Sequence, residues 1–254
     1  MASKTWDAVD HYFSGQGVVL LAERDPANGK PKGFVSVGNV SALALSVATS
    51  VLEHKESHTG QRGTDLRLTT ETKVTLSMTM ENFIAENLAR VSRGQTTKIA
   101  TGNVTGEALK FYPGMVVPLA HIKVSAVVIN NGGTPLVAGT DYEVNEEAGS
   151  IKFAPTVATL IEGAALTANY TYADQFRVDA LTAGAKELYM RFEGLNTAEE
   201  NAPVVVEVFK FSTDPFQELA LIADTVQSFV LEGSVLADGF RTTGSKYFNV
   251  TKTN

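Results

Sequence analysis

Alternation of apolar side chains with small or polar ones, at a period of two, dominates this chain. In ALALSVATSV, residues 42–51, the larger side chains fall on one face and alanines and serines on the other. The face with the larger side chains comprises Leu43, Leu45, Val47, Thr49 and Val51. In TKVTLSM, residues 72–78, Val74, Leu76 and Met78 point one way. A period of two is typical of half-buried β-strands. The pattern therefore predicts a mainly β protein, and the small residues of 42–51 let another surface come close.

Other segments have the composition of strands. The expected strands are 17–23, 33–40, 186–194 and 204–212. Between the first two, RDPANGKPKG at 24–33 is rich in turn-forming residues and predicts a tight connection.

One segment, residues 79–94, has the spacing of a helix instead. Its apolar residues recur three and four positions apart, and they are Met80, Phe83, Ile84, Leu88 and Val91. Thr79 is the expected N-cap and Gly94 the expected end. The stripe predicts a single helix packed on a sheet, and core packing explains it without a cofactor.

The pattern of the sequence changes after Phe111, where turn-forming residues become frequent. Turn signals such as NNGG, AGTDY and NEEAGS follow one another about every ten residues, as in a small β-sandwich. We expect an inserted β module at 113–174. Residues 1–112 and 175–254 then form one discontinuous core domain.

Composition excludes several classes of function. The chain has 254 residues, no cysteine and a net charge of −7. Disulfides and thiolate chemistry are therefore excluded, and the scattered bases argue against tight nucleic-acid binding. No apolar run reaches the roughly 20 residues that cross a bilayer, and the N-terminus lacks a secretory pattern. We expect no membrane insertion. The charged fraction of 19% leaves neutral surface suited to burial against partners.

The stretch VLEHKESHTGQRG, residues 51–63, is the part of the chain that most resembles a metal-binding or catalytic motif. His54 and His58 have the spacing of a metal-binding pair on a helix. The segment before them alternates as a strand, and Thr59, Gly60 and Gly63 break regular structure. A solvated or interfacial loop is therefore favoured over a metal site. No nucleophile elbow, P-loop or dinucleotide-binding motif occurs, so no catalytic residues, cofactor or enzyme activity are expected.

The order of elements resembles a known family. YFSGQGVVLLAERDPANGKPKGFVSVGNVSALALSV is followed by LEHKESHTGQRGTDLRL, a strand, the helical ENFIAENLARVSRG and, near the end, GSKYFNV. Gly38-Asn39-Val40 and Gly60-Gln61-Arg62 carry most of the likeness. The chain looks like the major tail tube proteins of long-tailed, non-contractile (siphovirus-type) bacteriophages, over about 1–110 and 175–254.

The resemblance implies a β-sandwich or barrel-type tail tube fold with one packed helix. It implies a structural virion protein whose six-membered rings stack into a tube, the conduit for genomic DNA during ejection. The partners implied are copies of the chain itself, the tape measure protein in the lumen, and the tail tip and terminator proteins. DNA would pass without specific binding, past an acidic lumen. The protein would be made in the host bacterial cytoplasm and reside in the virion tail, with the inserted module on the tube exterior.

By position, the resemblance makes residues 52–66 a loop that reaches a neighbouring subunit or ring. The residues expected at that interface are Glu53, His54, Lys55, Glu56, Ser57, His58, Thr59, Gln61, Arg62 and Asp65. An N-terminal arm would add contacts through Trp6, Tyr12 and Phe13.

Two other classes of function remain open on the sequence. One is the inner tube of a contractile system, which would form the same rings. The other is a surface-exposed β-sandwich that binds a glycan or receptor, which would need exposed aromatic rings for sugar stacking.

Overall fold

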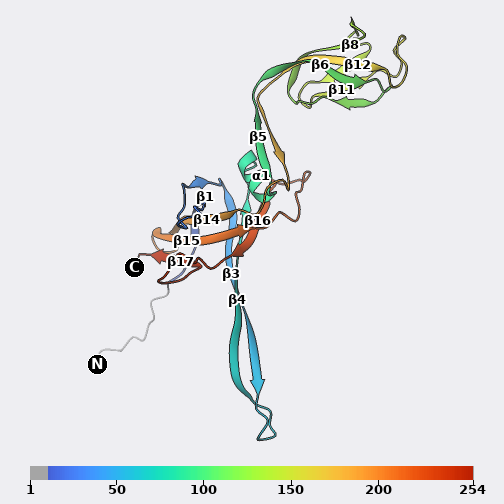
Figure 1. Cartoon of the computed structure of the whole chain (residues 1–254). Coiled ribbons are helices and arrows are strands. Elements are labelled where there is room, and N and C mark those ends of the chain that lie inside the picture. The colour runs from blue at the N-terminus through green and yellow to red at the C-terminus, as the bar shows by residue number, and fades with distance from the viewer. Residues whose placement is uncertain (1–10, 254) are drawn as a thin grey trace. The chain divides into compact units, whose positions relative to one another are not determined.

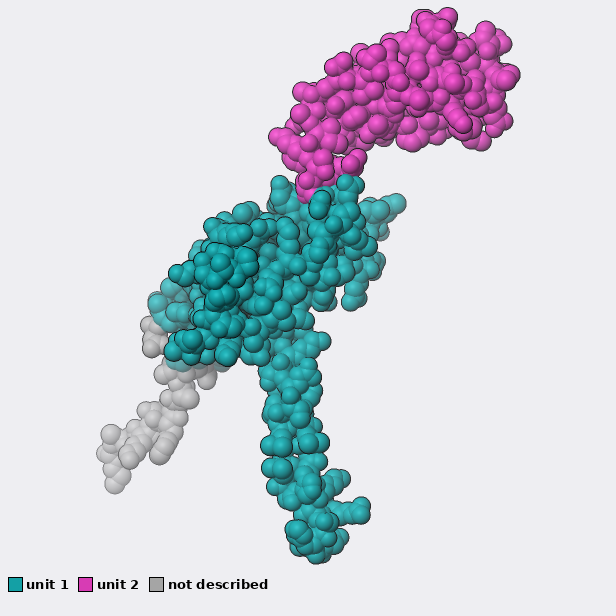
Figure 2. Space-filling view, in the orientation of Figure 1, with its two compact units in different colours: residues 1–95, 178–254 teal, residues 96–177 magenta. Residues whose placement is uncertain are grey.

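The structure is a computed structural model that describes residues 11–253 and divides into two compact units (Figure 1). Unit 1 comprises the described parts of 1–95 and 178–254, and unit 2 comprises 96–177 (Figure 2). The described residues are mainly strands in antiparallel sheets and include a single α-helix. The predicted mainly β class with one helix is therefore confirmed.

Unit 1 is built on an eight-stranded antiparallel sheet in the order β2-β1-β14-β15-β16-β4-β3, with β17 also paired to β15. The strand bounds are β1 Gly15–Glu23, β2 Val35–Ser36, β3 Val40–Lys55, β4 Thr64–Met80, β14 Glu187–Asn196, β15 Ala202–Thr213, β16 Phe229–Val235 and β17 Phe248–Lys252. Alternation and composition predicted strands at each of these positions except β16 and β17, and the resemblance to tail tube proteins implied a closing strand at GSKYFNV, residues 244–250, which overlaps β17. The predicted strand 33–40 is interrupted and yields only β2 and the first residue of β3.

The core of unit 1 follows the predicted alternation. Val74, Leu76 and Met78 are all buried, as expected from TKVTLSM. They join one apolar cluster with residues of β1, β14, β15 and β16, including Leu21 and Leu231. Only the first residues of β3 contribute to this cluster. Leu43 and Leu45 pack against the cluster, whereas Val47, farther along the strand, is exposed.

The helix is shorter than predicted. Helix α1 covers Ala85–Val91, whereas the sequence pattern indicated 79–94. Thr79 and Met80 remain in β4 because each pairs with a residue of β3 on one side and of β16 on the other. The expected cap at Thr79 is therefore wrong, and the N-cap is Ile84, which makes no side-chain cap hydrogen bond.

A buried amide fixes the start of α1 in place of a cap. The Asn87 side chain donates hydrogen bonds to the carbonyl oxygens of Val37 (2.8 Å) and Asn82 (3.1 Å). Val91 is fully buried and Leu88 packs beside it, so the helix lies on the core as predicted. Phe83 is exposed instead, because it precedes the helix and only touches Phe229 edge-on.

Unit 2 is a small β-sandwich with its own core. One sheet has the order β6-β12-β8-β9 and the other β10-β11-β7. The bounds are β6 Gly102–Lys110, β7 Val116–Pro118, β8 Val124–Asn131, β9 Thr134–Pro135, β10 Tyr142–Asn145, β11 Ser150–Phe153 and β12 Ala165–Tyr172. Both sheets contribute to one buried cluster, in which Phe111 and Phe153 meet edge-on at 5.2 Å.

The inserted unit is longer than the module expected at 113–174. It begins at residue 96 because β6 pairs along its length with β12 and so belongs to this sandwich. Strands β5 (Gln95–Ile99) and β13 (Gln175–Asp179), where the chain enters and leaves, form a separate two-stranded sheet.

Candidate assembly surfaces

The most exposed regular structure of unit 1 is the outer half of the β3–β4 hairpin. Strand β16 pairs with β4 only from Val74 to Met80, so among the described residues β3 is the sole strand beside Thr64–Lys73. We call residues 48–73 the hairpin arm. It is the ribbon that extends from the sheet in Figure 1. The predicted loop 52–66 is wrong at both ends, because β3 continues to Lys55 and β4 begins at Thr64.

The arm carries apolar side chains that nothing in the described chain covers. Leu52 and Leu68 are direct cross-strand partners and are 59% and 48% exposed. The next pair on the same face is His54 opposite Leu66, which is also exposed. Isolated two-stranded hairpins are marginally stable in water, and exposed apolar patches mark interaction sites. The arm therefore has the composition of a surface that another molecule covers.

The turn of the arm is closed by one carboxylate. Glu56 accepts hydrogen bonds from the backbone N–H groups of His58 (2.8 Å) and Thr59 (3.0 Å) and from the Thr59 hydroxyl. These bonds, the Thr59 hydroxyl first, hold the pKa of the Glu56 carboxyl below its usual value. Glu56 is thus occupied in shaping the turn, which also presents Ser57, Gln61 and Arg62.

Other charges on the arm are paired across the strands. The His54 ring nitrogen Nδ1 lies 2.6 Å from the Asp65 carboxylate, and Arg67 lies 3.7 Å from Glu53. The ten residues predicted at the interface all lie on this arm. Close to its turn the bases Lys55 and Arg62 lack an acidic partner among the described residues, whereas Glu53, Glu56 and Asp65 are engaged by Arg67, the turn and His54.

His54 and His58 do not come together in a site that could bind a metal ion. His54 lies in β3 and contacts Asp65, whereas His58 lies in the turn, where its backbone bonds to Glu56. Within residues 11–253 no group of three histidine, aspartate or glutamate side chains is placed to hold a metal ion. The geometry is that of a strand and turn, which separates side chains that a helix would bring to one face.

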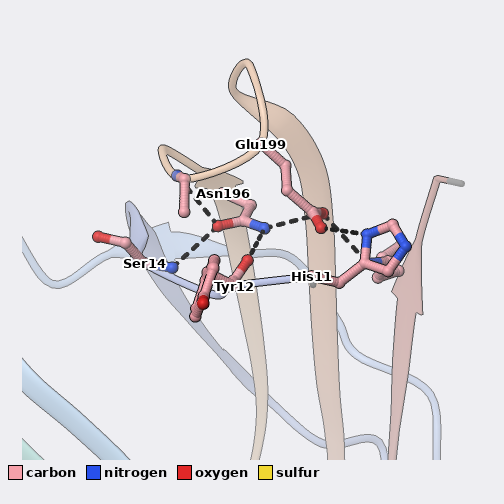
Figure 3. Close-up of polar contacts among 7 residues, drawn as sticks. His11, Tyr12, Ser14, Asn196 and Glu199 are labelled. Atoms are coloured by element: carbon pink, nitrogen blue, oxygen red, sulfur yellow. Dashed lines mark hydrogen bonds and ion pairs between the residues drawn. The ribbon is translucent and has the colours of Figure 1, made fainter. Parts of the chain in front are cut away.

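The N-terminal segment is attached to unit 1 by polar contacts (Figure 3). The buried Asn196 side chain accepts a hydrogen bond from the Ser14 N–H (2.8 Å) and donates one to the Tyr12 carbonyl (2.8 Å). His11 lies 2.6 Å from Glu199. His11 first, and Lys252 second, lower the pKa of the Glu199 carboxyl.

This attachment leaves aromatic rings at the surface. The side chains of Tyr12 and Phe13, both predicted contact residues, are exposed. The third predicted residue, Trp6, lies outside the described residues. Asn196, which anchors the segment, was not identified from the sequence, where it appears only as part of a turn-rich stretch.

Unit 2 contains a polar cluster that the sequence also did not indicate. The His121 ring stacks on Tyr172 with centroids 3.7 Å apart, and its Nδ1 lies 2.9 Å from the Tyr170 hydroxyl. The Tyr170 hydroxyl donates to Glu107. Burial, with Glu107 adding to it, raises the pKa of Tyr170, so the hydroxyl stays a donor. The arrangement cross-links β6, β12 and the segment before β8.

A second exposed apolar region of unit 1 was missed entirely. Residues 214–228, between β15 and β16, form no helix or strand and expose Leu221, Ile222 and Val226. The only sequence feature that marks this region is the apolar run LALI at 219–222, and apolar runs are more often buried.

The family described as Protein of unknown function UCP028589 matches residues 12–251. The chain belongs to this family. The match spans both units and both candidate surfaces, the hairpin arm and residues 214–228. No curated protein matches the chain. No helix within the described residues has the length and apolar character needed to span a membrane.

Proposed function

We propose that this protein is a self-assembling structural subunit, the tail tube protein of a long-tailed bacteriophage. Six copies form a ring and stacked rings form the conduit for DNA. The observation that carries the proposal is the edge strand β3, which has no charged residue and no proline from Val40 to Leu52. It continues directly into the exposed hairpin arm.

An edge strand of this kind is unusual in a protein that stays monomeric. Unpaired backbone groups at a sheet edge template pairing with another chain, and monomeric proteins blunt such edges with lysine, proline, bulges or very short strands. Within the described chain β3 pairs only with β4, and its register is regular from Ala42 to Ser50. Edge-to-edge pairing of copies around a closed ring removes the exposed edge.

The opposite end of the sheet supplies a second edge. Strand β2 pairs with β1 only at Leu20 and Leu21, and the Val37 N–H bonds to the Val19 carbonyl, so the free part of this edge within the described chain is residues 15–18. The two edges differ, and pairing one with the other is a head-to-tail contact that closes into a ring when the rotation fits. The number of six copies in the ring is taken from the resemblance to tail tube proteins.

The outward face of the same sheet suits a conduit. Ser46, Thr75 and Ser234 are aligned across three strands, and Ser212 continues the row on β15. The adjacent row is Ala44, Ser77 and Glu232. Small hydroxyl side chains with an acid and no base in these two rows would let phosphates slide, since binding DNA requires clustered lysine and arginine.

Other parts of the proposal follow from this assembly. Unit 2 would lie on the tube exterior, and the tape measure protein would occupy the lumen before DNA passes. The tail tip and terminator proteins would cap the two ends. The hairpin arm and the exposed Tyr12 and Phe13 would contact neighbouring copies.

Electron microscopy of the purified protein over a range of concentrations tests the proposal. We expect rings or tubes with six-fold end views. Ala44→Lys, which places a charge on the edge strand, should abolish them while the protein stays folded. Val230→Lys is the matched control, because Val230 lies exposed on the same face but on the interior strand β16. A wild-type protein that stays monomeric at the highest concentration, or rings that survive Ala44→Lys, would refute the role of β3.

A further inference from the structure

Residues 214–228 form an exposed segment that is both apolar and acidic, and we call it the acidic segment. Ile222 is 96% exposed, and Leu221 and Val226 are nearly as exposed. DPFQELALIADTVQS contains Asp214, Glu218 and Asp224 and no basic residue. Asp214 pairs with Arg93 at 3.2 Å, whereas Glu218 and Asp224 have no basic partner among the described residues.

The start of the acidic segment is fixed to unit 1. The Phe216 N–H donates to the carbonyl oxygen of Val91 (2.7 Å), and Arg93 donates to the Thr213 carbonyl. The exposed apolar residues therefore follow a stretch that is attached to unit 1. Large apolar side chains exposed together in this way mark an interaction site.

The acidic segment and the turn of the hairpin arm lie at opposite ends of β4. The turn precedes Thr64, and the acidic segment leads into Phe229, which pairs with Met80 at the other end of the strand. A strand of this length spans on the order of 50 Å. Figure 1 shows α1, to which the acidic segment is attached, at the end of β4 away from the turn. The two regions cannot touch within one copy.

The hairpin arm and the acidic segment complement each other. The arm exposes Leu52, Leu66 and Leu68 and carries the unpaired bases Lys55 and Arg62 near its turn. The acidic segment exposes three apolar side chains flanked by two unpaired acids. Apolar contact rimmed by opposite charges is the usual anatomy of a specific interface.

We propose that the hairpin arm of one copy docks on the acidic segment of a copy in the next ring. This inference rests on the proposed function, and it names the surface that receives the arm. Because donor and acceptor surfaces lie at opposite ends of unit 1, the contact is head-to-tail and repeats without closing, as stacking of rings requires. The contact covers both exposed apolar regions at once.

Site-directed cross-linking tests this contact, since a chain without cysteine allows thiols to be placed at will. Gln61→Cys places a thiol in the turn, and Ile222→Cys places one in the acidic segment. Val250→Cys is the matched control, because Val250 is an exposed apolar residue on β17 of the same unit. Each partner is mixed with a tagged Gln61→Cys chain, allowed to assemble and treated with a short bismaleimide. Electron microscopy of the same samples scores assembly.

We expect mixed dimers with Ile222→Cys and not with Val250→Cys, and a ladder of covalent oligomers from the doubly substituted Gln61→Cys/Ile222→Cys chain. Assembled samples with equal yields for both partners would overturn the contact and leave the proposed function standing. So would assembled samples in which Gln61→Cys chains mainly cross-link to each other, which indicates arm-to-arm docking. Samples that contain neither assemblies nor cross-links would overturn the proposed function itself.

Discussion

The two halves of the β3–β4 ribbon differ in what covers them. In the inner half, Val74, Leu76 and Met78 alternate with polar residues and are buried under the rest of the sheet and α1. In the outer half, Leu66 and Leu68 alternate in the same way and are exposed. The two halves have the same period, and a register shift between Ser50 and Val51 separates them and turns Leu66 and Leu68 to the other face of the ribbon. The alternation thus specifies the strand, and the neighbouring elements decide whether its apolar face is buried.

Within the described chain, the outer half therefore lacks the neighbouring strand or helix that would complete its packing. Three or more strands, or a packed helix, are normally needed to stabilise a hairpin. The inner half has these neighbours within its own chain, whereas the outer half has none among the described residues. A second copy that supplies the missing neighbour explains why apolar residues are placed on an exposed ribbon.

The largest effect is expected in the inner half. Leu76→Ala removes a fully buried side chain at the centre of the unit 1 cluster. Such a truncation leaves a cavity and should lower the free energy of unfolding by about 2–5 kcal/mol. Urea unfolding followed by circular dichroism measures it. A change below about 0.5 kcal/mol, the range of surface substitutions, would contradict the distinction between the two halves.

The corresponding change in the outer half should separate stability from assembly. Leu68→Ser should lower the unfolding free energy of the monomer by no more than about 1 kcal/mol, because the side chain is half exposed and its main contact is the cross-strand one with Leu52. It should raise the critical concentration for assembly by about three- to tenfold, since fully burying a leucine contributes about 1.5–3 kcal/mol and about half of this side chain is left to bury. Light scattering against concentration measures this.

Leu68→Met is the control for that substitution, since it keeps apolar character and nearly the same volume. It should assemble close to the wild-type concentration. Equal critical concentrations for all three proteins would mean that the outer half stays in water after assembly, and the comparison between the halves would then lose its functional meaning.

The sequence predicted the elements that local pattern determines. The period of two located β3 and β4, and the inward residues Val74, Leu76 and Met78 are those of the core. The ten residues expected at an interface also lie together on the arm. The strands and their inward residues depend on side-chain alternation, which one sequence displays directly. The interface residues came from the resemblance to tail tube proteins, and their role stays a prediction.

The elements that it failed to predict depend on partners distant in the chain. Met80 has helical spacing with Phe83 and Ile84, but its pairing with Val40 and Phe229 keeps it in a strand. Residues 102–110 join unit 2 because β12, about sixty positions later, pairs with them. Residues 214–228 carry no strand or helix pattern, and the exposure of Leu221 and Ile222 is visible only in the structure.

The smallest effect concerns the turn that ends the outer half. Because hydrogen bonds from Thr59 and His58 lower the pKa of Glu56 in the folded turn, its ionised form stabilises the turn above the ordinary value of 4.5. That contribution should disappear as pH falls below 4.5 through the lowered pKa. The amide signals of His58 and Thr59 in NMR spectra should therefore hold steady near neutral pH and move only in acid.

Glu56→Gln is the control for the pH experiment, since its neutral amide can still accept hydrogen bonds but does not titrate. In that variant the same two amide signals should not follow a titration below pH 4.5. A wild-type midpoint at or above 4.5 would show that the carboxylate is not bonded to the turn and that the end of the arm has no fixed shape.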